Sequence, residues 1–280
     1  MTRLSVRRAY SGFMVVVAGL CTVLAAGVLA AVIFYVVENG AGALRPSFFT
    51  KLPAPIGIPG GGIANAIAGS ALVIAMASIA AIPIGVLAGI YLALYGRGKT
   101  ATAVRFLSDV LTGVPSIAIG VFAYALVVLP SRHFSALSAS VALAIIMLPI
   151  IVRTTEEAVR LVPHSIREGA LALGIPTWKA VLLVTLPCAR AGIVTGTLLA
   201  IARVAGESAP LLFTAFGSLF WGRGVNSPTA ALPLVIFQYA ISPYKDWQQF
   251  AWGGALVLII FVFLLNLAAR LALPSRMPSR

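Results

Sequence analysis

The side chains that enzymes use for catalysis are sparse in this chain, and their positions argue against a catalytic site. The sequence holds two histidines, His133 and His164, and two cysteines, Cys21 and Cys188. Long apolar segments predict that the histidines lie on opposite sides of a membrane, so they cannot share a metal ion or belong to one catalytic triad. The cysteines stand alone and are typical of small apolar filler. We therefore expect no enzyme, no cofactor and no metal site, with a membrane enzyme as the weaker alternative.

One segment resembles a phosphate-binding P-loop but lacks the structural context for one. Residues 93–100 read ALYGRGKT, with alanine in the place of the first glycine. A P-loop works because it joins a β-strand to the N-terminus of a helix, whose amide groups face the phosphates. Here an apolar segment typical of a membrane helix precedes the motif. Lys99 is therefore interpreted as a basic residue at the end of a span, and we expect no nucleotide site.

The longest polar stretch of the chain, residues 153–188, has the pattern of a helical hairpin. Pro163 can begin a helix in its first turn. Gly174 supplies a left-handed C-terminal cap, and Pro176 prevents the helix from continuing. A second short helix follows and is expected to end at Leu186-Pro187. Each helix has one apolar face, formed by Ile166, Ala170 and Leu173 in the first and by Trp178, Val181, Leu182 and Thr185 in the second.

We expect this hairpin, residues 163–187, to lie along the inner face of a membrane. Its apolar faces would pack against the ends of the spans, while Arg167 and Glu168 would project into the cytoplasm. The simplest alternative is an amphipathic element that only lies at the interface, which is common in membrane proteins.

Two opposite charges stand inside the fifth apolar segment. Arg203 and Glu207 are four residues apart, so a continuous helix would place them on one face. Charges within a span are costly and normally face the interior of a helix bundle or an aqueous path. Two interpretations remain open: a self-neutralising pair that holds the bundle together, or a transient cation for a passing anion, which Glu207 prevents from being trapped. The pairs Gly85/Gly89 and Gly192/Gly196 have the spacing of close helix packing.

The composition indicates which elements must position these residues. Of the 280 residues, 60% are hydrophobic and 10% are charged, against about a quarter charged in soluble domains, and the mean hydropathy is +1.04. A bilayer core is crossed by about 20 helical residues, so the sequence predicts an all-α polytopic membrane protein. We place six spans at about residues 11–37, 63–95, 110–129, 136–152, 189–215 and 251–273. Pro83 predicts a kink in the second segment, unless part of that segment lies outside the lipid core.

The distribution of basic residues orients these spans. Fourteen Lys and Arg residues lie at the N-terminus, in the loops 96–108 and 153–190 and from residue 270 onward, whereas five lie in the loops on the opposite side. Because retained loops carry the excess of Lys and Arg, both termini are expected in the cytoplasm. This topology accounts for the net charge of +13. No basic face with interleaved aromatic residues supports binding of nucleic acid.

The spacing within the hairpin resembles the EAA loop of ABC importer permeases. In that family, Glu-Ala-Ala is followed after three residues by Gly, and after nine more by Ile-x-Leu-Pro. This chain has Glu168-Gly169-Ala170, then Gly174, then Val184-Thr185-Leu186-Pro187. Gly169 and Val184 are the two departures, and both are small changes. Gly169 slightly weakens the helix but keeps a surface for close approach.

Further stretches resemble the A-type permease subunit of the phosphate-specific ABC transport system, a type I ABC importer permease of the binding-protein-dependent transport family. Residues 202–215, ARVAGESAPLLFTA, are similar to the fifth-span signature of that subunit. Residues 113–116 with Gly120, and residues 82–85, are similar to other parts of it. The resemblance covers about residues 60–215. The C-type partner subunit has a similar plan but usually lacks the Ser-Ala-Pro-Leu-Leu run.

The resemblance implies a division of the chain and a set of partners. Residues 1–62 would form an N-terminal transmembrane helix and a periplasmic loop, residues 63–273 a five-helix permease domain with the coupling loop at 153–188, and residues 274–280 a cytoplasmic tail. In the bacterial inner membrane, phosphate delivered by a periplasmic binding protein would follow a path past Arg203 and Glu207, shared with a homologous C-type permease. Two copies of a separate ATPase subunit would dock on the hairpin, at Glu168, Gly169, Ala170, Gly174, Leu186 and Pro187.

Two alternatives to phosphate import remain open. One is a permease for another oxyanion, such as molybdate or sulfate, because no residue pattern here separates tetrahedral oxyanions on physical grounds. The other is a passive channel, which would conduct ions from this chain alone, without an ATPase.

Overall fold

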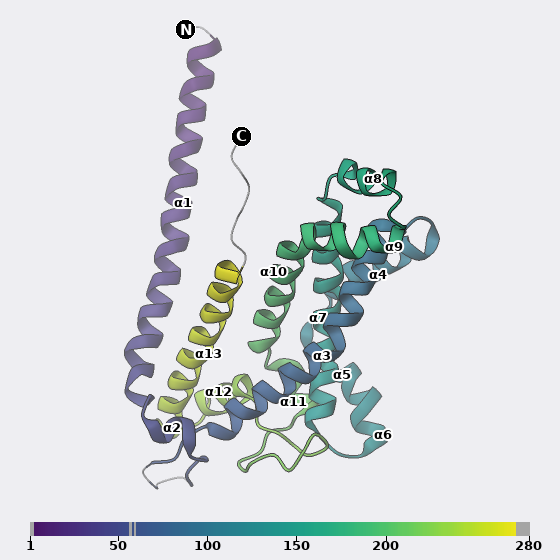
Figure 1. The fold of residues 1–280 in the computed structure, drawn as a ribbon. Helices are drawn as coiled ribbons and strands as arrows, with labels where there is room; N and C mark the ends of the chain where they lie inside the picture. The colour runs from purple at the N-terminus through teal and green to yellow at the C-terminus, as the bar shows by residue number, and fades with distance from the viewer. Residues whose placement is uncertain (1–2, 56–57, 59, 273–280) are drawn as a thin grey trace.

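The computed structural model describes residues 3–55, 58 and 60–272, and it consists of helices joined by loops (Figure 1). Within this part of the chain no β-strand occurs, apart from one isolated bridge between Phe216 and Thr229. Among these described residues, five helices are long and apolar enough to cross a membrane, and a bent pair of helices makes a sixth candidate. The all-α architecture expected from the composition is therefore confirmed.

The first helix, α1 (Arg3–Gly40), contains the expected first span and lies beside the last, α13 (Lys245–Ala272) (Figure 1). The two helices meet near the C-terminal end of α1, where the rings of Tyr35 and Trp252 pack edge to face with centroids 5.3 Å apart. Gly40 permits this approach, because a Cβ there would lie 2.6 Å from the backbone oxygen of Trp252. Residues 10–34 of α1 are all exposed, as expected of a helix that faces lipid.

The core of the molecule is the pair α3 (Ala64–Leu94) and α7 (Ala136–Arg160), which contribute most of the largest hydrophobic cluster. Small residues allow the two helices to approach closely. A Cβ added to Gly85 would lie 2.8 Å from Ile151, and Gly89 makes a similarly close approach one turn further on. The packing seam predicted from the spacing of these glycines is confirmed.

The third apolar segment differs from the single span predicted at residues 110–129. It forms α4 (Lys99–Gly113), α5 (Ser116–Ala123), the π-helical η2 (Tyr124–Val128) and α6 (Leu129–Ser131). The chain bends by 107° between α4 and α5. Pro115 explains the break, because its ring disfavours a helical conformation of the preceding residue, and Val114 is extended with ψ of 132°. The predicted basic loop at 96–108 is also wrong, since helix α4 occupies most of it.

Other helices extend past the apolar segments from which they were predicted. The fourth span, expected at residues 136–152, continues as α7 to Arg160. The last begins at Lys245 instead of residue 251, and the loop expected at 216–250 contains α12 (Leu232–Ala240). Backbone hydrogen bonding continues a helix beyond its apolar part, so hydropathy alone predicts helices that are too short. Residues 273–280, with the predicted tail, lie outside the described residues.

The second helix of the hairpin does not end at Leu186-Pro187, contrary to the prediction. The chain forms α8 (His164–Ala172), α9 (Thr177–Ala180), the π-helical η3 (Val181–Thr185), α10 (Leu186–Ala205) and α11 (Ala209–Thr214). In η3 the amide of Leu186 donates to the oxygen of Val181, one residue further back than in an α-helix. The wider turn accommodates the ring of Pro187, which would clash in a regular helix. The helix therefore passes from the hairpin into the fifth span.

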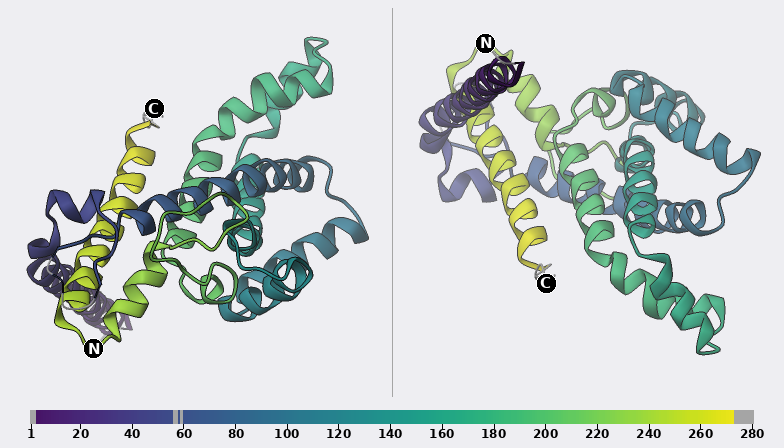
Figure 2. Two further views of the ribbon diagram at one scale, coloured as in Figure 1. Left: turned by 90° about the horizontal axis from the view of Figure 1, so that it is seen from below. Right: turned by 90° about the horizontal axis from the view of Figure 1, so that it is seen from above.

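The hairpin, the start of α1 and the end of α13 lie at the same end of the molecule (Figure 1). At the opposite end are the short helices η1 (Ala41–Ala43) and α2 (Pro46–Thr50). Viewed along the bundle, α8 projects from the side away from α1 and α13 (Figure 2). The fold thus presents the hairpin as a protrusion at one end of the helix bundle.

Candidate functional site

The turn of the hairpin is fixed by Gly174, which has φ of +78°. Its amide donates to the oxygen of Leu171 at 2.9 Å, and the amide of Ile175 donates to the oxygen of Ala170 at 3.3 Å. These two bonds form a Schellman motif, which satisfies the last carbonyl groups of α8 and requires a left-handed residue after the helix. The left-handed cap predicted from the sequence is confirmed, with Pro176 preceding the next helix.

The surface of the hairpin follows the predicted packing only in part, since Val181 and Thr185 of the second helix are buried as expected. Ala170 is buried, but Ile166 is 43% exposed, Leu173 82% and Trp178 61%. Glu168 is also exposed, as predicted. Apolar side chains that stay exposed in this way are typical of a surface that another protein covers. The hairpin therefore exposes both apolar and acidic groups.

The position of Arg167 differs from the one predicted for it in the hairpin. Arg167 was expected to project outward beside Glu168, but its side chain is half-buried and lines a cavity beneath α8. Successive positions of a helix are about 100° apart, so neighbours in sequence face different directions. Glu168 lies on the free surface, whereas Arg167 faces the bundle.

Arg203 and Glu207 meet, but not on one helix as the sequence predicts. Arg203 lies in the last turn of α10, and Glu207 follows the end of that helix at Ala205. The amide of Gly206 donates to the oxygen of Arg203, which closes the helix. Arg203 Nε and Glu207 Oε1 are 3.9 Å apart, with side chains 46% and 20% exposed. This long, partly exposed contact is a weak ion pair, so Arg203 keeps donors for another anion.

The structure does not bring the hairpin residues and the Arg203–Glu207 pair together. Pro187 and Arg203 stand near opposite ends of α10, about 24 Å apart along the helix axis at 1.5 Å per residue. The predicted fifth span at 189–215 is thus divided into α10 and α11, with the charged pair at the break. Helix α10 connects the hairpin to the Arg203–Glu207 pair.

A buried ionic network that the sequence analysis did not single out joins α3, α4 and α7. Glu156 is 1% exposed, and its Oε1 lies 2.7 Å from Nε of Arg105 and 2.6 Å from Nη2 of Arg160. Arg153 Nη1 lies 3.5 Å from Glu156 Oε2 and also binds Asp109 through Nε at 2.8 Å. Three arginines thus neutralise one buried carboxylate, which is costly to bury without partners.

Arg105 extends this network to the end of α3. Its Nη2 donates to the oxygen of Leu92 at 2.8 Å and to that of Gly96 at 3.2 Å, where the last carbonyl groups of a helix have no partner within it. In the sequence, Arg105 stands out only as one positive charge of a predicted cytoplasmic loop. The network could have been anticipated in part from the spacing of Arg153, Glu156 and Arg160 at i, i+3 and i+7, which places the three side chains on one face of a helix.

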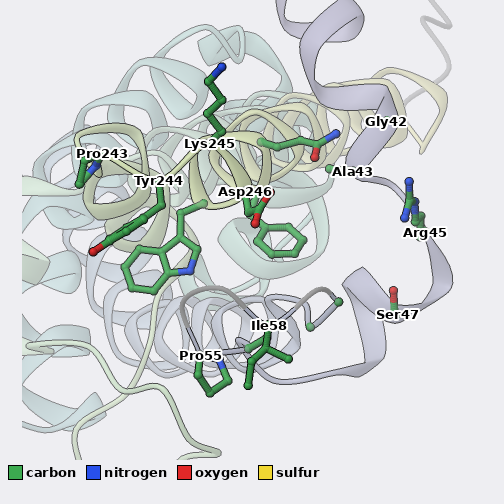
Figure 3. A pocket seen from close by; sticks show the side chains of 16 residues that line it. Gly42, Ala43, Arg45, Ser47, Pro55, Ile58, Pro243, Tyr244, Lys245 and Asp246 are labelled. Atoms are coloured by element: carbon green, nitrogen blue, oxygen red, sulfur yellow. The ribbon is translucent and has the colours of Figure 1, made fainter.

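A cavity of about 570 Å³ lies at the end of the molecule opposite the hairpin (Figure 3). The close view shows Tyr244 across the cavity from Pro55 and Ile58, with Lys245 pointing away from them. The ring of Trp247 stacks on Tyr239 with centroids 4.6 Å apart. Aromatic residues at the end of a span are typical of anchors at the membrane–water interface.

Comparison with known proteins supports a transport role for this arrangement. A family model described as "Binding-protein-dependent transport system inner membrane component" matches residues 85–275. The phosphate transport system permease protein PstA of Yersinia pestis is 46% identical over 240 residues, covering 85% of this chain and 81% of that protein. PstA of Xylella fastidiosa is 49% identical over 246 residues, covering 87% and 85%. PstA 1 of Mycobacterium tuberculosis is 40% identical over 211 residues, covering 75% and 69%.

A solved structure supports the fold. The methionine ABC transporter MetNI, in an inward-facing conformation, superposes with a TM-score of 0.59 at 21% identity. The match covers 74% of this chain and 94% of that one. The helix arrangement described above is therefore that of an ABC importer permease.

Proposed function

The chain belongs to the family of binding-protein-dependent transport system inner membrane components, and we propose that it is the permease subunit through which an ATP-driven importer passes inorganic phosphate. The observation that carries this proposal is the identity of 46% and 49% to phosphate permeases of two species, over more than four fifths of their length. The Gly206-Glu207-Ser208 segment, which connects α10 and α11, lies within residues 202–215, the stretch that resembles the fifth-span signature of such permeases.

We propose that the hairpin is the docking site for the ATPase, with two ATPase copies in the assembly and a homologous C-type permease completing the path. Glu168, Gly169 and Ala170 lie on α8, and Gly174 sets the angle of the turn. The exposed apolar side chains of the hairpin support contact with a partner. Leu186 and Pro187 begin α10, so a displacement of the hairpin is transmitted directly to the fifth span. A periplasmic protein would deliver the phosphate.

We further propose that both termini and the hairpin face the cytoplasm of a bacterial inner membrane. The excess of Lys and Arg on that side supports this orientation. We also propose that the chain has three parts: residues 1–62 provide the N-terminal helix and outer loop, residues 63–273 the permease domain and residues 274–280 the tail. ATP is hydrolysed on the separate subunit, and this chain supplies the path.

Labelled-phosphate uptake in cells lacking this gene tests the proposal. Complementation with the gene should restore ATP-dependent uptake, which excess unlabelled phosphate should suppress and excess sulfate or molybdate should not. Uptake that is suppressed by sulfate or molybdate but not by unlabelled phosphate would indicate a permease for one of those oxyanions. Uptake that persists after deletion, with no related gene present, would contradict a phosphate permease.

Replacement of Arg203 by alanine should lower transport without releasing the ATPase. The side chain lies about 24 Å from Pro187 along α10, so its loss should not disturb the hairpin, whereas a passing anion would lose a cation. Uptake and co-purification of the ATPase should be measured on the same membranes. Arg203→Lys retains the charge and should keep most of the uptake. Release of the ATPase from the Arg203→Ala assembly would show that the division between path and docking site is wrong.

A further inference from the structure

A second cavity, of about 750 Å³, lies beneath the hairpin. Its walls are the end of α3 with the turn that follows, the end of α7, the start of α8 and η3. Four lining residues carry basic side chains, namely Arg97, Arg160, His164 and Arg167. Among the described residues that line it, none is acidic. This chemistry favours an anionic occupant, and the cavity is separate from the Arg203–Glu207 pair.

Arg167 is the lining residue that most needs a partner. Its Nε is buried and has no hydrogen-bond partner among the described residues. A buried donor left unpaired is unfavourable, and anionic oxygens accept strong hydrogen bonds from a guanidinium group. The first residue of α8, His164, lines the same cavity, so the amide groups of the first turn add positive potential there.

The carboxylate that binds Arg160 does not neutralise the cavity. Arg160 binds Glu156 at 2.6 Å, but Glu156 also binds Arg105 at 2.7 Å and is not a lining residue. Arg97 and Arg167 take part in no ion pair within the described part of the chain. Two guanidinium groups on different elements therefore remain available to one anion.

We propose that this cavity binds a phosphate group, carried either by free inorganic phosphate or by the headgroup of an anionic phospholipid. Guanidinium groups bind phosphate through paired hydrogen bonds, and basic pockets at the cytoplasmic ends of helices suit phospholipid headgroups. The bound group contacts Arg97, which follows α3, and Arg167 on α8, and so links the hairpin to the bundle. The site does not depend on which solute the chain transports.

Hydrogen exchange of the full chain in maltoside micelles tests this site in two arms. Inorganic phosphate is added in one arm, and phosphatidylglycerol without free phosphate in the other. Exchange in α8 and in residues 95–98 should slow by about tenfold when the ligand is at ten times its Kd, because binding suppresses local opening in that proportion. Slowing in the first arm identifies free phosphate as a ligand, and slowing in the second identifies the lipid headgroup. Potassium chloride at matched ionic strength should have no effect.

Variants locate the effect in the cavity. Arg97→Gln with Arg167→Gln should abolish the slowing, whereas Arg97→Lys with Arg167→Lys should retain it. Arg190→Gln, a change at an exposed arginine of α10 outside the cavity, and Arg203→Ala should also retain it. The absence of slowing in both arms would overturn the proposal. Slowing by chloride, or slowing that survives in the double glutamine variant, would overturn it as well.

Discussion

Replacing Gly174 by valine should abolish uptake and substrate-stimulated ATP hydrolysis together, while the chain still inserts and still pairs with the other permease. Gly174 holds φ of +78°, a conformation that costs a residue with a Cβ about 1–2 kcal/mol and a β-branched residue more. No atom lies within 4 Å of a Cβ placed there, so the effect acts through the backbone alone. Relief of the strain would redirect α8 and separate Glu168 from the ATPase.

Two other substitutions control for the change in side-chain volume. Gly174→Asn should retain most of the uptake, since asparagine tolerates the left-handed conformation. Gly169→Ala adds a Cβ in open space within helix α8, and it should be neutral or slightly stabilising. Uptake, ATP hydrolysis and co-purification of the subunits should be measured for all three variants. Normal transport by Gly174→Val would contradict coupling through the hairpin.

The second large effect is expected at Glu156, the buried carboxylate of α7 that binds Arg105 of α4. Glu156→Leu leaves Arg105 and Arg160 facing an apolar side chain, and removing one partner of a buried ion pair typically costs about 3–5 kcal/mol. We expect about 3 kcal/mol, at the low end, because the Arg105 and Arg160 side chains are 22% and 54% exposed and remain partly hydrated. Thermal unfolding of the purified chain in detergent measures the loss of stability.

The adjacent residue supplies the control for Glu156. Glu157 is exposed on the same turn of α7, so Glu157→Leu should change the stability by no more than about 0.5 kcal/mol. Glu156→Gln keeps an oxygen acceptor for Arg105, so the stability of this variant should lie between those of the two leucine variants. Equal stability of the Glu156→Leu and Glu157→Leu proteins would show that the network does not hold α4 against α7.

The sequence predicted the features that depend on local chemistry. Gly174 between α8 and Pro176 is one example, because a left-handed cap followed by proline depends on only a few adjacent residues. The seam at Gly85 and Gly89 is another, since its spacing alone places both residues on one face of a helix. The number of apolar segments followed from the same kind of reasoning.

Features that depend on distant contacts or on backbone adjustment were not predictable in this way. Glu156 is separated from Arg105 by 51 positions, so nothing local indicates that it is buried and neutralised. The π-helical turn before Pro187 allows the helix to continue where a proline was expected to end it. Pro115 indicates a break at Val114. The continuous apolar character of residues 110–129 nevertheless favours a single span, so the break was not predicted.

ATP-dependent uptake of labelled phosphate into proteoliposomes tests the proposed function most directly. The vesicles should contain this chain, the C-type permease and the ATPase, with the binding protein outside and ATP inside. We expect phosphate to accumulate only when all subunits and ATP are present, and we expect vesicles with this chain alone to remain impermeable. Equal accumulation when this chain is omitted, or phosphate conductance by this chain alone, would contradict its role as the permease of an ATP-driven importer.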